Sequence, residues 1–204
     1  MIREPDAIEK RSMEIIESEL TVPVPPEVKD IVKRVIHCTA DFDYAENLAF
    51  SENAARRAHE ALLSGCDIVT DTQMVRSGIN KAAAGKLGCG IHCFMSDPDV
   101  AEEAKRRGCT RAAVSMEKAM KLDRKLIFAI GNAPTALLTL SDFIRDGKLM
   151  PELVIGVPVG FVNILESKEA IMRSGAEYIV ARGRKGGSNV AAAIVNALMY
   201  RITR

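Results

Sequence analysis

The segment LVIGVPVGFVNILESKEAIMRSGAEYIVARG, residues 153–183, contains two short apolar runs separated by a stretch with helical character. The runs LVIGVP (153–158) and YIVARG (178–183) are rich in β-branched residues, which favour strands. Two parallel strands need a crossover between them, usually a helix, and such strands are buried on both faces. The segment therefore predicts one βαβ unit of a parallel sheet covered by helices.

The same alternation of apolar runs and helical stretches occurs earlier in the chain. Three further runs precede the segment, and they are DIVT (67–70), CGIHC (89–93) and LIFAIG (126–131). Five such strands joined by right-handed crossovers give a three-layer α/β/α fold with a mostly parallel five-stranded sheet. We expect a single domain over residues 1–204.

Composition excludes several classes of function. The 204 residues carry a net charge of +1, so no basic field suggests nucleic acid binding. Aromatic residues make up 4% and Trp is absent, which argues against a stacking surface for bases or sugars. No apolar run has the length of a membrane helix, and charges interrupt the region where a signal peptide would be apolar. We expect a cytoplasmic protein that binds neither nucleic acid nor a membrane.

The five cysteines are scattered and odd in number, which favours buried thiols in a reducing compartment. The one cluster to consider as a metal site is CGIHC (89–93). On a strand, Cys89 and Cys93 share one face while His92 points to the other, so the three cannot form a tetrahedral site. We expect no metal.

Two N-terminal helices are predicted beside the α/β core, over residues 5–20 and 25–37. The first has an apolar stripe in which Ser12 is the polar exception, with Arg11 at its edge. Ser12 is either a small packing residue or a polar contact to a ligand. The stripe is formed by Ile8, Ile15, Ile16 and Leu20.

His37 ends the second helix, which starts with Pro25 and has a regular apolar stripe. By helical phase, His37 lies on the side opposite this stripe, which disfavours a core histidine. The negative end of the helix dipole favours the protonated imidazolium, and Asp41 and Asp43 would add to this if they fold back toward the ring. His59 falls in a charged stretch and is expected at the surface. His37 is therefore the best acid–base candidate.

Ligands of an open parallel sheet bind beyond the carboxyl ends of its strands. The run RGRKGGS (182–188) follows the last strand, combines glycines with three cations, and leads into an Ala-rich helix with Ser188 or Asn189 available as its N-cap. This pattern predicts a site for carboxylate or phosphate groups, with a solvated basic turn as the alternative. It matches neither a Walker A loop nor GxGxxG, so a nucleotide is not indicated.

Several blocks of the sequence resemble the precorrin-8X methylmutases, a family that includes the cobalt-precorrin-8 methylmutases. These blocks are VIHCTADFDYAENLAFS, TDTQMVRSGI, GNAPTALL, GVPVGFVNILESKEA and YIVARGRKGGSNVAAAIVNAL. The resemblance covers nearly the whole chain, from about residue 2 to about residue 200. Gln73 departs from the family, in which this position often carries Arg.

The resemblance implies an isomerase of corrin biosynthesis that moves a methyl group from C-11 to C-12 of the macrocycle, giving hydrogenobyrinate or cobyrinate. It implies a [1,5]-sigmatropic shift without redox cofactor or S-adenosylmethionine, and a homodimer whose cleft uses both subunits. The histidine of the family's VIH block is His37 here, and its role is proton donation or hydrogen bonding to the tetrapyrrole. We expect substrate contacts from Arg11, Ser12, Thr72, Gln73, Arg76, Arg111, Asn132, Arg182, Arg184, Lys185, Gly186, Gly187 and Ser188.

Two alternative functions stay open at this point. One is a different α/β enzyme that acts on another anionic metabolite and holds its phosphate at RGRKGGS (182–188). The other is a corrinoid-binding carrier that has the fold and the cleft without catalysis. A carrier would not depend on His37 for turnover, and that is the feature that separates the two classes.

Overall fold

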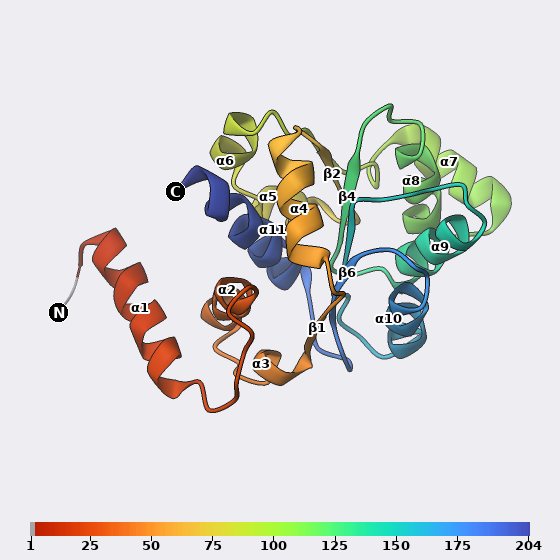
Figure 1. Cartoon of the computed structure of the whole chain (residues 1–204). Coiled ribbons are helices and arrows are strands. Elements are labelled where there is room, and N and C mark those ends of the chain that lie inside the picture. Colours follow the sequence, from red (N-terminus) through yellow and green to blue (C-terminus); the bar gives the residue numbers. More distant parts are fainter. Residues whose placement is uncertain (1–2) are drawn as a thin grey trace.

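The computed structural model describes residues 3–204. These form six strands and eleven helices, which alternate along most of the chain (Figure 1). The strands are β1 (Leu48–Phe50), β2 (Asp67–Thr70), β3 (Ile91–His92), β4 (Leu126–Ile130), β5 (Leu153–Gly156) and β6 (Tyr178–Ala181). The helices are α1 (Pro5–Glu19), α2 (Lys29–Thr39), α3 (Tyr44–Asn47), α4 (Ala54–Leu63), α5 (Gln73–Gly78), α6 (Lys81–Lys86), α7 (Pro98–Arg107), α8 (Arg111–Ala119), α9 (Pro134–Arg145), α10 (Ile164–Met172) and α11 (Ser188–Thr203).

The sheet has the strand order β1-β6-β5-β4-β2-β3. Its last five strands run parallel, as predicted, and the prediction of five strands was wrong by one. The additional strand is β1, which pairs antiparallel with β6 at the sheet edge. It is three residues long, too short to show the alternation that identifies a strand in a sequence. β3 is also shorter than the predicted run 89–93.

Successive residues of the strands point to opposite faces of the sheet, and each face is covered by helices. In β4, Ile127 and Ala129 belong to one apolar cluster, whereas Phe128 and Ile130 belong to the other. Figure 1 shows α2, α4, α5, α6 and α11 on the first side and α7 to α10 on the second. The three-layer α/β/α architecture is therefore confirmed.

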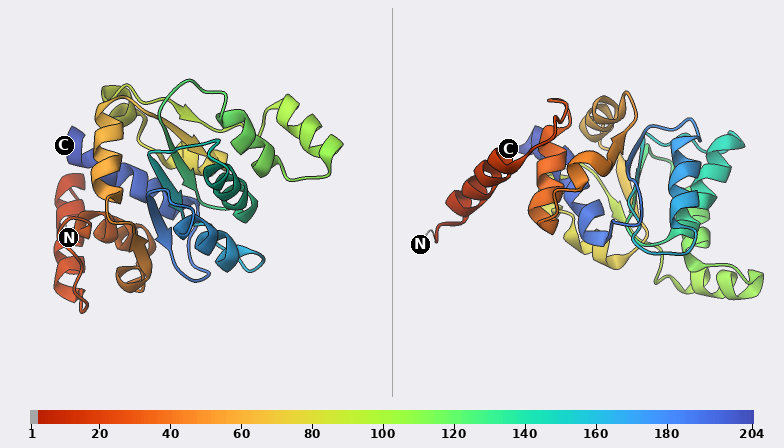
Figure 2. Two further views of the ribbon diagram at one scale, coloured as in Figure 1. Left: turned by 45° about the vertical axis from the view of Figure 1, so that its right-hand side comes forward. Right: turned by 90° about the horizontal axis from the view of Figure 1, so that it is seen from below.

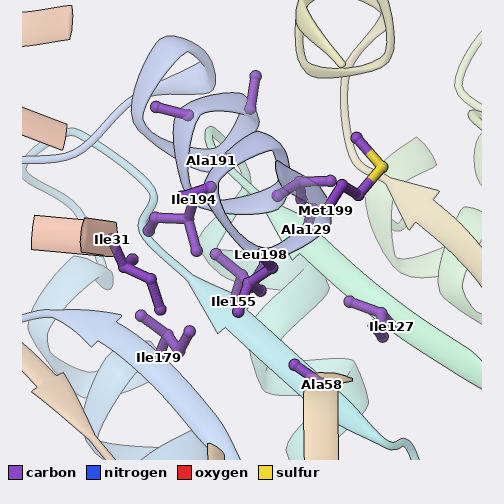
Figure 3. Packing of buried hydrophobic residues seen from close by; sticks show 14 of the residues in the cluster. Ile31, Ala58, Ile127, Ala129, Ile155, Ile179, Ala191, Ile194, Leu198 and Met199 are labelled. Carbon is purple, nitrogen blue, oxygen red and sulfur yellow. The ribbon is translucent and has the colours of Figure 1, made fainter. Parts of the chain in front are cut away.

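Helix α11 runs along the centre of the first layer and packs against α2. Its many alanines allow close approach, and Figure 3 shows Ile194 and Leu198 of α11 beside Ile155 of the sheet, with Ile31 of α2 nearby. The α2 stripe is buried as predicted, although the helix begins at Lys29 rather than at Pro25. Val28 has a non-helical ψ of 0°, so residues 25–28 form a turn that precedes the helix.

Helix α1 projects from one edge of the molecule, as both views in Figure 2 show. Its Glu9 binds Arg34 of α2 at 2.6 Å, and Glu17 binds Lys33 at 3.0 Å. Within its predicted core stripe only Ile16 is buried, whereas Ile8 is 45% and Ile15 40% exposed. The stripe prediction was therefore wrong for half of its residues, because α1 contacts its own chain along one narrow face only.

None of the helices within residues 3–204 combines the length and the apolar character that crossing a bilayer requires.

Candidate active site

The carboxyl ends of β2, β4 and β6 meet at the N-terminus of α11. Thr72, which follows β2, shares a hydrogen bond of 3.0 Å with Ser188 through their hydroxyl oxygens. Gly131, which follows β4, lies so close to Ser188 that a Cβ on it would be 2.7 Å from the Ser188 Cα. Glycine is therefore required at position 131 for this approach. These contacts bring the loops after β2, β4 and β6 together at the predicted ligand-binding edge of the sheet.

Asp71 holds the loop that follows β4. Its buried carboxylate accepts hydrogen bonds from the N–H groups of Gly131 at 2.9 Å, Asn132 at 2.8 Å and Ala133 at 2.6 Å. Burial raises the pKa of Asp71, and the three N–H donors act in the opposite direction. The carboxylate thus fixes the backbone that carries the exposed Asn132. Because the three N–H groups already donate to Asp71, they are not free to bind a ligand.

The loop Gly183–Gly187 has backbone conformations that favour glycine, with φ of +72° at Gly183, +156° at Gly186 and +136° at Gly187. The Gly187 N–H donates to the carbonyl of Val157 at 2.8 Å, so the loop lies against the residues that follow β5. A Cβ on Gly186 would be 2.1 Å from the same carbonyl oxygen. The run of glycines predicted as a ligand loop is therefore also required by close backbone packing.

The N-cap of α11 is Gly187, so the prediction of Ser188 or Asn189 at this position was wrong. Ser188 is the first helical residue, and its hydroxyl bonds to Thr72 instead of capping the helix. No side chain caps this end of α11 within the described residues. Its N–H groups and its positive dipole end stay available to an anion.

The three cations in and beside the loop are exposed, namely Arg182, Arg184 and Lys185, and the last two have partners in the chain. The Arg184 guanidinium lies 5.3 Å from the ring centroid of Phe161, which is itself 81% exposed. The Lys185 ammonium binds Asp41 and Asp43, each at 2.6 Å. The hydrogen bonds that Lys185 donates to Asp41 and Asp43 raise its pKa. Lys185 must therefore exchange these partners before it binds a carboxylate of a ligand.

His37 is in the last turn of α2 and is exposed, as its helical phase predicted. The adjacent Cys38 places this end of α2 against α11, since its Sγ lies 3.9 Å from the carbonyl oxygen of Asn189. Asp41 and Asp43, which would support His37 if they folded back toward its ring, bind Lys185 instead. These contacts bring the His37 end of α2 to the edge of the Gly183–Gly187 loop.

Other predicted residues lie at the margin of this surface. Gln73 and Arg76 are on α5, where the Gln73 Nε2 is 3.4 Å from the Ser96 hydroxyl and the Arg76 Nε donates to the Ile91 carbonyl at 3.3 Å. Arg111 opens α8 beside the start of α9, where Thr110 and Thr135 share a hydrogen bond of 2.8 Å. Arg182 is exposed at the end of β6.

Arg11 and Ser12 are not brought to this surface within the chain. They are on α1, whose inner face contacts α2 and the C-terminal end of α11 through Glu9, Arg34 and Arg204. Ser12 donates to the carbonyl of Ile8 at 2.9 Å, and Arg11 pairs with Glu14 at 3.1 Å. The Gly183–Gly187 loop precedes the N-terminus of α11, whereas α1 contacts the C-terminal end of that helix.

The CGIHC segment forms no cluster with the site. The His92 Nε2 is 2.9 Å from the Asp67 carboxylate at the start of β2, and Cys89 and Cys93 are buried. Within residues 3–204, no group of three His, Cys, Asp or Glu residues is arranged to hold a metal ion. His59 is exposed on α4, as predicted.

Comparison with known proteins determines the family. The precorrin-8X methylmutase family model matches residues 7–201, nearly the whole chain. The chain belongs to the precorrin-8X methylmutase family. A cobalt-precorrin-8 methylmutase of Priestia megaterium is 47% identical over 96% of this chain and 87% of its own. A cobalt-precorrin-8 methylmutase of Leptospira interrogans is 44% identical over 94% of this chain and 91% of its own.

A solved precorrin-8X methylmutase structure from Thermus thermophilus has the same fold. It superposes with a TM-score of 0.87 and 36% identity, covering 95% of this chain and 96% of that one. The predicted family is therefore confirmed, and with it the class of activity, a methylmutase isomerase of cobalamin biosynthesis.

Two buried charged residues that hold loops of the site were not among the substrate contacts expected from the sequence. Asp71 appears there as the first residue after a strand, and only the structure shows it buried under three N–H groups. Lys168 appears as a polar residue of the helix ESKE, a pattern typical of a solvated face. The one available signal is its position inside a block that carries the family resemblance.

Proposed function

We propose that this chain moves a methyl group from C-11 to C-12 of a precorrin-8 macrocycle, with His37 as the proton donor. The observation that carries the proposal is the position of the exposed His37 beside an uncapped helix end and a glycine-rich cationic loop, in a chain of this family. A ring fringed with carboxylates binds to the loop, and the imidazolium meets its edge. No nucleophile is needed for an intramolecular shift.

The catalytic effect follows from orientation and one placed proton. A protonated or hydrogen-bonded macrocycle withdraws electron density from the migrating system, and a rigid cleft holds the methyl-bearing carbon next to its acceptor. His37 is in the last turn of α2, at the negative end of the helix dipole, where a proton donor faces solvent and ligand. Carboxylate contacts from Arg182, Arg184, Ser188 and the loop glycines fix the plane of the ring.

The active site we propose is shared between two subunits. Arg11 and Ser12 are far from the ligand loop of their own chain, on a helix that projects outward (Figure 2). The neighbouring Ile8 and Ile15 are apolar and exposed, which suits a surface covered by a second copy. A homodimer in which α1 reaches the partner cleft gives Arg11 and Ser12 a ligand to contact.

We further propose the cobalt-bearing form of precorrin-8 as the substrate and the cytoplasm as the compartment. Both relatives described above are named for cobalt-precorrin-8. Five free cysteines suit a reducing compartment. Turnover of the metal-free and the cobalt-bearing substrate by one preparation tests the first point, and equal or higher turnover of the metal-free form would contradict it.

The acid role is tested by His37→Ala, with His59→Ala as a matched control on the exposed face of α4. We expect His37→Ala to convert precorrin-8 about 100-fold or more slowly, because it lacks the donor. Its affinity for hydrogenobyrinate, measured by visible absorbance, should change by less than about threefold, because the loop is intact. The control should retain full activity.

Unchanged turnover in His37→Ala would contradict the acid role. Tight corrinoid binding without turnover in the wild type would instead identify a carrier. Binding of inorganic phosphate or a nucleotide with no response to a tetrapyrrole would favour an enzyme of another anionic metabolite.

A further inference from the structure

Lys168 is a buried charged residue directly beneath the ligand loop. It lies in the middle of α10 (Ile164–Met172) and is 2% exposed. Its ammonium donates to the carbonyl of Gly183 at 2.8 Å and to the carbonyl of Lys185 at 2.9 Å. Burial lowers the pKa of Lys168 to about 8, so the group still carries its charge at neutral pH.

These two contacts determine the orientation of two peptide groups of the loop. A trans peptide is planar, and its N–H points opposite to its C=O. The carbonyls of Gly183 and Lys185 point inward to Lys168, so the N–H groups of Arg184 and Gly186 point outward. Within residues 3–204, neither of these N–H groups donates a hydrogen bond. The loop therefore presents two unused donors on the side away from Lys168.

The same loop is held at intermediate points by other backbone contacts. The Arg184 carbonyl accepts from Gly160 at 3.2 Å, and the Gly187 N–H donates to Val157 at 2.8 Å. These bonds attach the loop to the residues after β5, while Lys168 sets the rotation of the peptides between them. Without the ammonium, two buried carbonyls would lose their donor, and the peptides would turn to find another.

We propose that Lys168 is a positioning residue that turns the N–H groups of Arg184 and Gly186 toward the cleft, where they bind one carboxylate of the substrate. This inference rests on the proposed function for the identity of the ligand. Two neighbouring backbone N–H donors without partners suit the two acceptor oxygens of a carboxylate. Lys168 itself does not contact the substrate, and the buried ammonium adds a positive charge behind the pair.

The first test compares Lys168→Met, Lys168→Arg and the wild type, with Lys148→Met as the control. Lys148 is an exposed lysine that pairs with Asp146 at 2.8 Å and makes no hydrogen bond or ion pair with the 183–187 loop among the described residues. We expect Lys168→Met to raise KM for precorrin-8 about tenfold while kcat stays within about twofold, because ground-state carboxylate binding is lost. Lys168→Arg has donors for both carbonyls and should recover most of the loss.

The second test needs no variant and stays informative if Lys168→Met does not fold. Amide hydrogen exchange of the wild type should be fast at Arg184 and Gly186 in the free protein. It should slow by about tenfold or more with hydrogenobyrinate bound, because each N–H then has an acceptor. Exchange that is already slow in the free protein, or unchanged on binding, would overturn the proposal.

The outcomes separate this proposal from the proposed function. A loss of stability with unchanged KM in Lys168→Met would show a purely structural lysine and overturn the positioning role. A loss of kcat at constant KM would also contradict it. Failure of the wild type and of Lys148→Met to convert precorrin-8 would instead contradict the proposed function, and the exchange experiment would still report on the loop.

Discussion

Two loops at the carboxyl edge of the sheet are each held by one buried charge, and the two charges have opposite signs. Asp71 accepts the N–H groups of Gly131, Asn132 and Ala133, whereas Lys168 donates to the carbonyls of Gly183 and Lys185. The carboxylate consumes the donors of its loop. The ammonium consumes the acceptors and leaves donors facing outward, so the 183–188 loop is the one suited to anions.

Asparagine at position 71 removes the carboxylate from the first loop at nearly constant volume. An amide has one acceptor oxygen, and its NH2 group faces at least one buried N–H donor, so Asp71→Asn should lower the free energy of unfolding by about 2–4 kcal/mol. Urea unfolding followed by circular dichroism measures this. Asp123→Asn, at an exposed position, is the control. A loss below about 0.5 kcal/mol would show that the Asp71 carboxylate contributes little to folding.

The charge that holds the second loop should be visible in the pH dependence of stability. Lys168 has a pKa lowered to about 8 in the folded chain and an ordinary value of 10.5 when unfolded. Between these values the unfolded chain binds more protons, so the free energy of unfolding rises with pH. With allowance for solvent screening, wild type should gain about 1–2 kcal/mol over Lys168→Met between pH 8 and pH 10.

Urea unfolding of both proteins at several pH values gives this difference, since other lysines contribute equally to each. A constant difference across that range would contradict a desolvated Lys168. Asp71 predicts a different pH window. Burial raises its pKa above the ordinary value of about 4, so above that pH the folded chain holds this proton more tightly and the contribution of Asp71 to the free energy of unfolding falls as pH rises.

The strands β2, β4, β5 and β6 and their burial were predictable because each apolar run is continuous and lies between turn residues, whereas β3 is shorter than predicted and half-buried. β1 was not predictable, since LAF is only three residues long and owes its conformation to β6. The position of His37 followed from helical phase alone. The N-cap of α11 was mispredicted because Ser188 has a competing partner, Thr72, that comes from a distant part of the chain.

Charged residues were the least predictable part of the site. The pairing of Asp41 and Asp43 with Lys185 joins residues more than a hundred positions apart, and no local pattern signals it. Lys168 has polar neighbours in ESKE that suggest a solvated face, yet it is buried by the loop that it holds. The apolar stripe of α1 predicted a core, and it is half exposed because α1 contacts the rest of the chain along one narrow face only.

The most direct test of the account is a crystal structure of the protein with hydrogenobyrinate bound. We predict a carboxylate of the ligand within hydrogen-bonding distance of the backbone nitrogens of Arg184 and Gly186, with the macrocycle edge against His37. The N–H groups of Asn132 and Ala133 should stay on Asp71. A ligand carboxylate on the backbone N–H groups of the 131–133 loop, or a macrocycle that leaves the 183–188 loop facing solvent, would contradict it.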